Sequence, residues 1–199
     1  MESIQSTNES IKLRKLVIIP AYNESASIVN TVNDIKKNAP DFDYVVINDH
    51  SKDNTLQICK DAGLNVIDLP LNLGIGGAVQ TGYLYACQNG YDIAVQFDGD
   101  GQHDAKYLNE MAETLVKEQA DMVIGSRFIE KEGFQSSFTR RLGIRYFTFL
   151  IKILTGQKIT DPTSGYRMCN RKIIELFAGN YPKDYPCLLY TSPSPRDRG

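Results

Sequence analysis

The sequence has few cysteines, no long apolar run and no large excess of charge, and each absence argues against a class of protein. Its four cysteines, at positions 59, 87, 169 and 187, show no CxxC spacing, so neither a zinc site nor a disulfide framework is indicated. No stretch reaches the roughly 18 apolar residues that a membrane-spanning helix needs. Residues 1–14 are too polar for a signal peptide. We therefore expect a cytoplasmic chain with reduced thiols, soluble or peripheral to a membrane.

The charge pattern and two missing motifs argue against three classes of protein: nucleic-acid-binding proteins, P-loop NTPases and dinucleotide-binding proteins. The formal net charge is −2, with acidic and basic residues interspersed, so no nucleic-acid partner is expected. No G-x-x-x-x-G-K-[ST] loop is present, which excludes a P-loop NTPase. The glycines at 74, 76 and 77 lack the third glycine of the dinucleotide fingerprint G-x-G-x-x-G, and they follow the third predicted strand rather than the first.

What the sequence does contain is an alternation of short apolar runs with segments of helical periodicity. Strands are predicted at 15–19, 44–47, 66–69, 93–97 and 122–124, and helices at 25–37, 56–62, 78–89 and 107–117. This order is typical of βαβ units. We expect an α/β domain over residues 15–186, with a mostly parallel central sheet and helices on both faces, after a flexible leader at 1–14.

Polar loops follow four of these strands, at residues 20–24, 48–55, 72–77 and 98–103. They should converge on one crevice, because ligands of such sheets bind beyond the carboxyl ends of the strands. The glycines of the third loop suit either an anion at a helix N-terminus or close helix packing. In the second loop, Asp49 suits a nucleobase N–H, whereas Asp53 suits a helix N-cap equally well.

The fourth loop contains Asp98-Gly99-Asp100, which delivers two carboxylates to one spot after an apolar strand. Mg²⁺ and Mn²⁺ prefer such oxygen ligands together with phosphate oxygens, so this stretch predicts a metal–diphosphate site. Asp-Gly pairs also mark simple turns, and that alternative stays open for this stretch alone. A calcium loop of EF-hand type matches poorly, because its glycine and twelfth positions would hold His103 and Asn109.

Two later segments carry expectations of their own. Residues 138–156 have a cationic start followed by dense Ile, Leu, Phe and Tyr, which fits an amphipathic helix at a membrane surface or an ordinary core-packing helix. Residues 187–197 resemble a translated sequencing adapter. If so, 187–199 is a non-native tail, and the natural domain is truncated near Pro186.

Taken together, six motifs resemble those of family 2 glycosyltransferases, in the same order. They are the runs at 19–24, 48–55, 72–77, 97–102, 125–127 and 161–167. The closest branch looks like the dolichyl- and polyprenyl-phosphate sugar transferases. The resemblance covers about residues 15–186. It implies a GT-A fold and inverting transfer from a nucleotide sugar with Mg²⁺ or Mn²⁺.

The resemblance also implies roles for individual residues on the donor side. Those of the nucleotide-sugar site are Pro20, Tyr22, Glu24, Asp49, Gly74, Gly76 and Asp98. Asp98 and Asp100 correspond to the metal and diphosphate ligands, and Asp100 is also placed in the catalytic set. One departure concerns the base: Asn48-Asp49-His50-Ser51 stands where many relatives have Asp-Asp-Gly-Ser, so the choice between a UDP-sugar and a GDP-sugar stays open.

On the acceptor side, the implied residues depend on the nucleophile. A polyprenyl phosphate is already anionic near neutral pH, so arginines matter more than a base, and the candidates are Arg127, Arg140 and Arg141. A sugar hydroxyl needs a general base, for which Asp161 is the candidate; a loop cap before Pro162 is its structural alternative. The leading expectation is synthesis of a lipid-linked sugar for cell-surface glycans, at the inner face of the membrane.

Three other functions are alternatives to the transfer of a sugar to a polyprenyl phosphate. Transfer to a hydroxyl of a growing polysaccharide is the alternative within the same family. A nucleotidyltransferase is disfavoured because its G-x-G-x-R-x-x-P-x-T/S-x-x-x-P-K-type loop is missing. A non-catalytic nucleotide-sugar-binding module would bind the donor without turnover, and the presence of Asp98, Asp100 and Arg127 argues against it.

Overall fold

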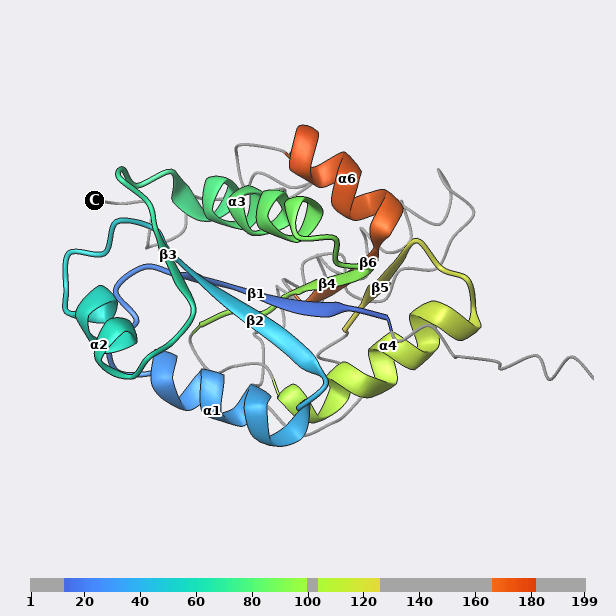
Figure 1. Cartoon of the computed structure of the whole chain (residues 1–199), viewed down its shortest axis with the longest axis horizontal. Helices are drawn as coiled ribbons and strands as arrows, with labels where there is room; N and C mark the ends of the chain where they lie inside the picture. Colours follow the sequence, from blue (N-terminus) through green and yellow to red (C-terminus); the bar gives the residue numbers. More distant parts are fainter. Residues whose placement is uncertain (1–12, 100–103, 126–165, 182–199) are drawn as a thin grey trace, which may run out of the picture.

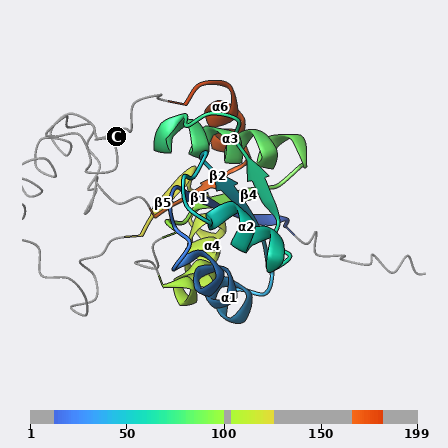
Figure 2. The same ribbon diagram turned by 90° about the vertical axis from the view of Figure 1, so that its left-hand side faces the viewer.

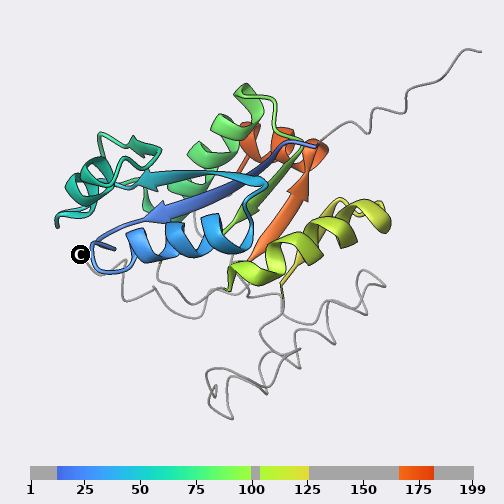
Figure 3. The same cartoon turned by 60° about the horizontal axis from the view of Figure 1, so that its bottom comes forward.

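The computed structural model describes residues 13–99, 104–125 and 166–181, which form a six-stranded sheet with helices on both faces (Figure 1). The strands are β1 (Lys15–Ala21), β2 (Phe42–Asn48), β3 (Val66–Asp68), β4 (Ile93–Gln96), β5 (Met122–Ile124) and β6 (Arg167–Asn170), in the order β3-β2-β1-β4-β6-β5. Strands β1 to β4 run parallel, whereas β6 is antiparallel to both β4 and β5. Figure 3 shows the blue arrows of β1 and β2 pointing away from the direction of the red arrow of β6. The predicted mostly parallel sheet is confirmed.

Side chains of the buried strands alternate between two apolar layers. On β1, Val17 and Ile19 face one layer, and Leu16 and Ile18 face the other. The first layer is covered by α1 (Ile28–Asn38), α2 (Thr55–Asp61) and α4 (Leu108–Lys117), which follows the short 3-10 helix η1 (Ala105–Tyr107); the second is covered by α3 (Gly74–Gln88) and α6 (Arg171–Gly179). Figures 1 and 2 show α3 and α6 on one side of the sheet and α1 and α4 on the other.

Strand β1 is longer than predicted, because Pro20 and Ala21 belong to the strand rather than to the loop. Its pairing with β4 ends at Ile18, whereas its pairing with β2 continues to Ala21. The Ile18 carbonyl accepts the N–H of Phe97, which follows β4, so Ile18 directs its backbone groups toward β4. Pro20, two residues on, directs its backbone nitrogen toward the same neighbour. The β4 ladder has already ended there, and the missing N–H of proline costs no hydrogen bond.

The starts of two helices also differ from prediction. Helix α3 begins at Gly74, so the glycines at 74, 76 and 77 lie in its first turn, and the predicted start at 78 is wrong. The expectation that these glycines open a helix is confirmed. Helix α1 begins at Ile28 rather than at residue 25, because residues 25–27 form a turn before it.

Strand β6 and helix α6 were not predicted. Strand β6 has only four residues, and polar Arg167 and Asn170 stand at its two ends, which hides the apolar run. Asn170 then caps α6, because its side-chain oxygen accepts the N–H of Ile173 at 3.1 Å.

Helix α3 packs very closely on the sheet at Gly82. A Cβ built on Gly82 would lie 2.1 Å from Cγ2 of Ile18 on β1. Both residues are buried. Only a glycine lets the helix backbone approach the strand this closely.

Several predictions lie outside the described residues. They concern Asp100, Arg127, Arg140, Arg141 and Asp161, the helix expected at 138–156, and the tail at 187–199. At the other end, Arg14 of the expected leader is already tied to the fold, because its N–H donates to Asp92 at 2.9 Å. Within the part of the chain that the structure describes, no helix combines the length and apolarity needed to cross a membrane.

Candidate functional site

The loops after β1 and β2 lie side by side at the carboxyl edge of the sheet. Hydrogen bonds between them form a joint, and Asn23 makes three of these bonds. Its N–H donates to Oγ of Ser51 at 3.0 Å. Its side-chain Oδ1 accepts the N–H of Lys52 at 2.8 Å and the N–H of Asp53 at 3.3 Å. Asn23 has a positive φ of 57°, a conformation that asparagine tolerates better than most residues. Two of the four predicted loops therefore meet as one unit.

A second set of hydrogen bonds continues this joint toward α2. The N–H of Glu24 donates to Oγ1 of Thr55 at 2.9 Å, and the N–H of Ser25 donates to Asp53 at 3.3 Å. Asp53 also accepts the N–H of Thr55 at 2.9 Å. Partial burial pushes the pKa of Asp53 upward, but the bonds from Thr55 and Ser25 outweigh it and leave that pKa below its usual value. The N-cap residue is Asn54, so the expectation of Asp53 as the N-cap is wrong; Asp53 instead accepts the N–H of Thr55 from the position before the cap.

Asp49 is buried at the end of β2 and anchors the loop that opens α3. It is only 3% exposed, and its Oδ1 accepts the N–H of Leu73 at 2.7 Å. Its backbone carbonyl accepts from the side chain of Asn72, whose Oδ1 in turn accepts the N–H of Gly74. Burial raises the pKa of Asp49, although the N–H groups of Leu73 and Gly74 and the nearby His50 act in the opposite direction. The third loop thus joins the first two through one carboxylate.

The start of the fourth loop lies against the first. A Cβ built on Gly99 would lie 3.2 Å from the carbonyl oxygen of Pro20 and 3.6 Å from Cγ of Glu24. The carbonyl of Gly99 also lies 3.2 Å from the hydroxyl of Thr31 on α1. Asp98, just before it, is half-buried, and Nε2 of Gln96 lies 3.5 Å from its Oδ1. The absence of a side chain at residue 99 therefore lets the backbone of the fourth loop lie against the loop after β1.

The residues that follow β4 and β5 and the residue that precedes β6 lie together at this same edge of the sheet. The N–H of Gly125 donates to the carbonyl of Tyr166 at 2.8 Å, and a Cβ on Gly125 would lie 2.6 Å from the Tyr166 ring. The same ring packs edge-on against Phe97, with 5.5 Å between centroids. Gly125 belongs to the motif at 125–127 and Tyr166 to the motif at 161–167. These two residues are 41 positions apart in the sequence and are in contact.

The structure thus brings Pro20, Glu24, Asp49, Gly74 and Asp98 to one edge, with half-buried Tyr22 in the first of these loops and buried Gly76 in the first turn of α3. Thr31 was missed, because a threonine inside an amphipathic helix gives no signal. Asn23 stands in the sequence only as one member of the motif at 19–24. Its positive φ and its distant partners are not visible in the sequence.

Asn48, the residue before Asp49, does not share the contacts of Asp49. It is 1% exposed, and its side-chain N–H donates to Asp68 on β3 at 2.6 Å. The other polar atom of its side chain, Oδ1, is buried and accepts no hydrogen bond from the residues that the structure describes. Asn48 therefore joins β2 to β3, while Asp49 holds the loop before α3.

Comparison with known proteins gives this arrangement a family. The model of glycosyl transferase family 2 matches residues 16–177. This chain belongs to glycosyltransferase family 2. The predicted family is therefore confirmed.

Two relatives in this family have polyprenyl phosphates in their names. The glycosyltransferase chain is 31% identical over 180 residues to the UDP-N-acetylglucosamine–dolichyl-phosphate N-acetylglucosaminyltransferase of Methanococcus voltae, covering 81% of this chain and 71% of that protein. It is 33% identical over 161 residues to the undecaprenyl-phosphate mannosyltransferase of Micrococcus luteus, covering 78% of this chain and 65% of that protein. The chain therefore spans only about two thirds to three quarters of these relatives.

A solved structure shows the fold. A mannosyltransferase of Pyrobaculum calidifontis, in complex with GDP-Man and Mn²⁺, superposes with a TM-score of 0.60 over 86% of this chain and 48% of that chain. Sequence identity is 18%, so the likeness shows the GT-A fold alone. The expected GT-A fold is confirmed.

The residues that the structure describes supply only part of a metal site. Among them no three His, Cys, Asp or Glu side chains cluster. The half-buried carboxylate of Asp98, at the end of β4, is an oxygen ligand that fits Mg²⁺ or Mn²⁺. The second predicted ligand, Asp100, lies outside the described residues.

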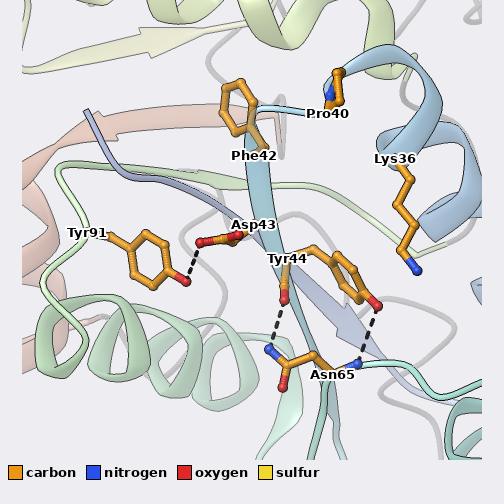
Figure 4. A pocket seen from close by; sticks show the side chains of 7 residues that line it. All are labelled: Lys36, Pro40, Phe42, Asp43, Tyr44, Asn65 and Tyr91. Carbon is orange, nitrogen blue, oxygen red and sulfur yellow. Dashed lines mark hydrogen bonds between the residues drawn. The ribbon is translucent and has the colours of Figure 1, made fainter. Parts of the chain in front are cut away.

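A groove of about 470 Å³ lies at the opposite, amino edge of the sheet (Figure 4). Its polar groups are engaged with one another: Tyr91 donates to Asp43 at 2.9 Å, and Asn65 bonds both the carbonyl and the hydroxyl of Tyr44. Lys36 stands over the Tyr44 ring at 5.1 Å. These lining residues therefore bond to one another. The groove is separate from the candidate site, which lies at the carboxyl edge.

Proposed function

We propose that this glycosyltransferase chain moves a sugar from a UDP- or GDP-sugar to a polyprenyl phosphate, with inversion at the sugar and with Mg²⁺ or Mn²⁺. The observation that carries the proposal is the junction of the loops after β1, β2 and β3 around buried Asp49, with Gly99 of the loop after β4 against Pro20. These loops lie beyond the carboxyl ends of parallel strands, where such sheets bind ligands.

Each described residue has a role in this proposal. Pro20, Tyr22 and Glu24 form one wall of the nucleoside pocket, and the Asp49 carboxylate accepts an N–H of the base. Gly74 and Gly76 place the N-terminus of α3 toward the diphosphate, because its backbone N–H groups favour an anion. Nothing in these roles selects uracil or guanine.

The metal and the acceptor complete the proposal. A divalent cation held by Asp98 and Asp100 would neutralise charge on the leaving nucleoside diphosphate. Arg127, with Arg140 or Arg141, would hold the lipid phosphate by charge-assisted hydrogen bonds. A phosphate nucleophile needs no strong base, so Asp161 would act as the base only with a hydroxyl acceptor.

Support for the acceptor comes from the two relatives whose names include dolichyl phosphate and undecaprenyl phosphate. A lipid acceptor requires the carboxyl edge of the sheet to approach a membrane. We therefore place the protein at the cytoplasmic face of the membrane, where it would serve the synthesis of cell-surface glycans.

The donor half is tested by thermal stabilisation with UDP and with GDP, each in Mn²⁺ and in EDTA, because a ligand of the folded state raises its apparent stability. We expect a shift with one nucleotide in Mn²⁺, reduced by Asp98→Ala. Asp41→Ala is the matched control, because Asp41 is an exposed carboxylate in the turn before β2, at the amino edge. No shift with either nucleotide in a cooperatively melting protein would refute the donor site.

The acceptor half is tested by transfer of labelled sugar to a polyprenyl phosphate. Arg127→Ala should abolish this transfer while leaving the nucleotide shift unchanged. Transfer that survives the substitution, or that goes only to a sugar hydroxyl, would contradict the lipid-phosphate acceptor and favour polysaccharide extension.

A further inference from the structure

Asn23 makes three of the hydrogen bonds between the loops after β1 and β2, beside those from Glu24 to Thr55 and from Ser25 to Asp53. Its own N–H donates to Ser51, and its side-chain oxygen accepts two backbone N–H groups, those of Lys52 and Asp53. These three bonds span 28 to 30 positions of sequence. One side chain therefore fixes the backbone of a distant loop.

The conformation of Asn23 makes this joint specific. Its φ of 57° lies in the left-handed region, which most L-residues avoid but asparagine and glycine adopt readily. An alanine at this position would lose the acceptor and strain the backbone. A glycine would keep the backbone and lose only the acceptor.

The two loops that Asn23 joins carry opposite walls of the proposed nucleoside pocket. Tyr22 and Glu24 flank Asn23 directly, and Asp49 lies two residues before Ser51. Asn23 itself is exposed and turned toward the second loop, as its three bonds show. Its effect on a nucleotide would therefore be indirect.

We propose that Asn23 is a positioning residue that sets nucleotide affinity by holding the two walls of the nucleoside pocket at a fixed separation. This inference rests on the proposed function. When the joint is broken, only a fraction of molecules has both walls in place, and the apparent dissociation constant rises by the inverse of that fraction. Two hydrogen bonds of ordinary strength correspond to roughly a 5- to 150-fold change in such a population. We expect the lower part of this range, about tenfold, because the bond to Asp53 is long at 3.3 Å and the bonds from Glu24 and Ser25 remain.

The test is calorimetric titration of UDP and GDP into the full chain and its variants. Asn23→Gly should weaken binding of the recognised nucleotide about tenfold. Gln119→Gly is the matched control, because Gln119 also has a positive φ, 49°, but lies in the turn after α4. It should leave the dissociation constant unchanged. Asn23→Asp keeps both the acceptor and the conformation and should stay within about threefold of wild type.

A second measurement separates positioning from simple loss of stability. Hydrogen exchange at the amides of Lys52 and Asp53 should accelerate in Asn23→Gly and slow again when nucleotide is added. Ser51→Ala breaks the joint from the other loop and should weaken binding in the same direction. Unchanged affinity in both Asn23→Gly and Ser51→Ala, with only a lower melting temperature, would overturn the inference. Failure of the wild type to bind either nucleotide would instead refute the proposed function on which it depends.

Discussion

Replacing Asn48 by aspartate should destabilise this protein, because Asp68 is the hydrogen-bond partner of Asn48. The Asn48 side chain donates to the Asp68 carboxylate at 2.6 Å and is 1% exposed. In Asn48→Asp the donor is lost and two carboxylates face each other. The buried Oδ1 of residue 48, to which no residue in the described part of the chain donates, would then carry charge without a donor.

The expected cost follows from these contacts. Loss of a hydrogen bond to a charged group costs about 1.5–3 kcal/mol. Two like charges that relax to about 4 Å apart add about 1–4 kcal/mol, toward the low end because Asp68 is exposed. We expect the free energy of unfolding to fall by about 3 kcal/mol at pH 7. For a chain of this size, that corresponds to a melting temperature lower by roughly 6–12 °C.

The effect should depend on pH with a definite sign. In the folded variant the two carboxyl groups share a proton and hold it at higher pH than the unfolded chain, whose aspartates titrate near pH 3.9. A folded-state pKa above the unfolded one means that stability is recovered as pH falls. The difference from wild type should therefore shrink as pH is lowered from 8 toward 4.

The assay is urea denaturation across this pH range, with two companions. Asn48→Ala loses the hydrogen bond without adding charge, so its deficit should not depend on pH. The exchange Asn48→Asp with Asp68→Asn restores an amide–carboxylate pair and should recover part of the loss. A variant Asn48→Asp as stable as wild type at pH 7, or a deficit that is the same at all pH values, would refute the reasoning.

Three further predictions follow from contacts described above. Gly82→Ala should lower the free energy of unfolding by about 1–3 kcal/mol, since the clash with Ile18 exceeds a gain in helix propensity of about 1 kcal/mol; a more stable variant in urea denaturation would contradict this. Burial raises the pKa of Cys59, and that of Cys169 to about 12, so both thiols should react with a disulfide reagent only after denaturation, and rapid native labelling of either would be contrary. Burial also holds the pKa of Asp49 above 3.8, so nucleotide affinity measured by calorimetry should weaken as pH falls through that raised value; Asp49→Asn should bind weakly at every pH, and a pH-independent wild type would count against Asp49 as the base acceptor.

The sequence predicted those helices and strands whose bounds depend on their own residues rather than on neighbouring strands. Strand β5 at residues 122–124 was predicted with its bounds, because its apolar run stands alone between polar segments. Pro20 was placed in a loop by its local properties, whereas the structure keeps it in β1 because the ladder toward β4 stops at Ile18. Strand β6 was missed for the opposite reason, since its polar ends are accommodated by the neighbours on both sides.

The candidate site was predicted as a set of residue types, but not as a set of contacts. Asp49 and Asp98 were named from their places after strands, and both lie at the carboxyl edge. The joint through Asn23 depends on partners that are 28 to 30 positions away, and the support of Gly99 by Thr31 comes from another helix. The roles of Asp100, Arg127, Arg140, Arg141 and Asp161 stay predictions.

The position of β6 between β4 and β5 has a consequence for how the protein is made. Residue 93 pairs with residue 170, and residue 122 with residue 169, so the last strand enters the interior of the sheet. On the ribosome, β1 to β4 can assemble early, but β4 keeps an open edge until residue 170 has emerged. Such late, non-local closure slows folding and exposes a strand edge to other chains in the meantime. Nascent chains released just after residue 125 should therefore aggregate more than chains released after residue 181, which sedimentation of the two products would reveal.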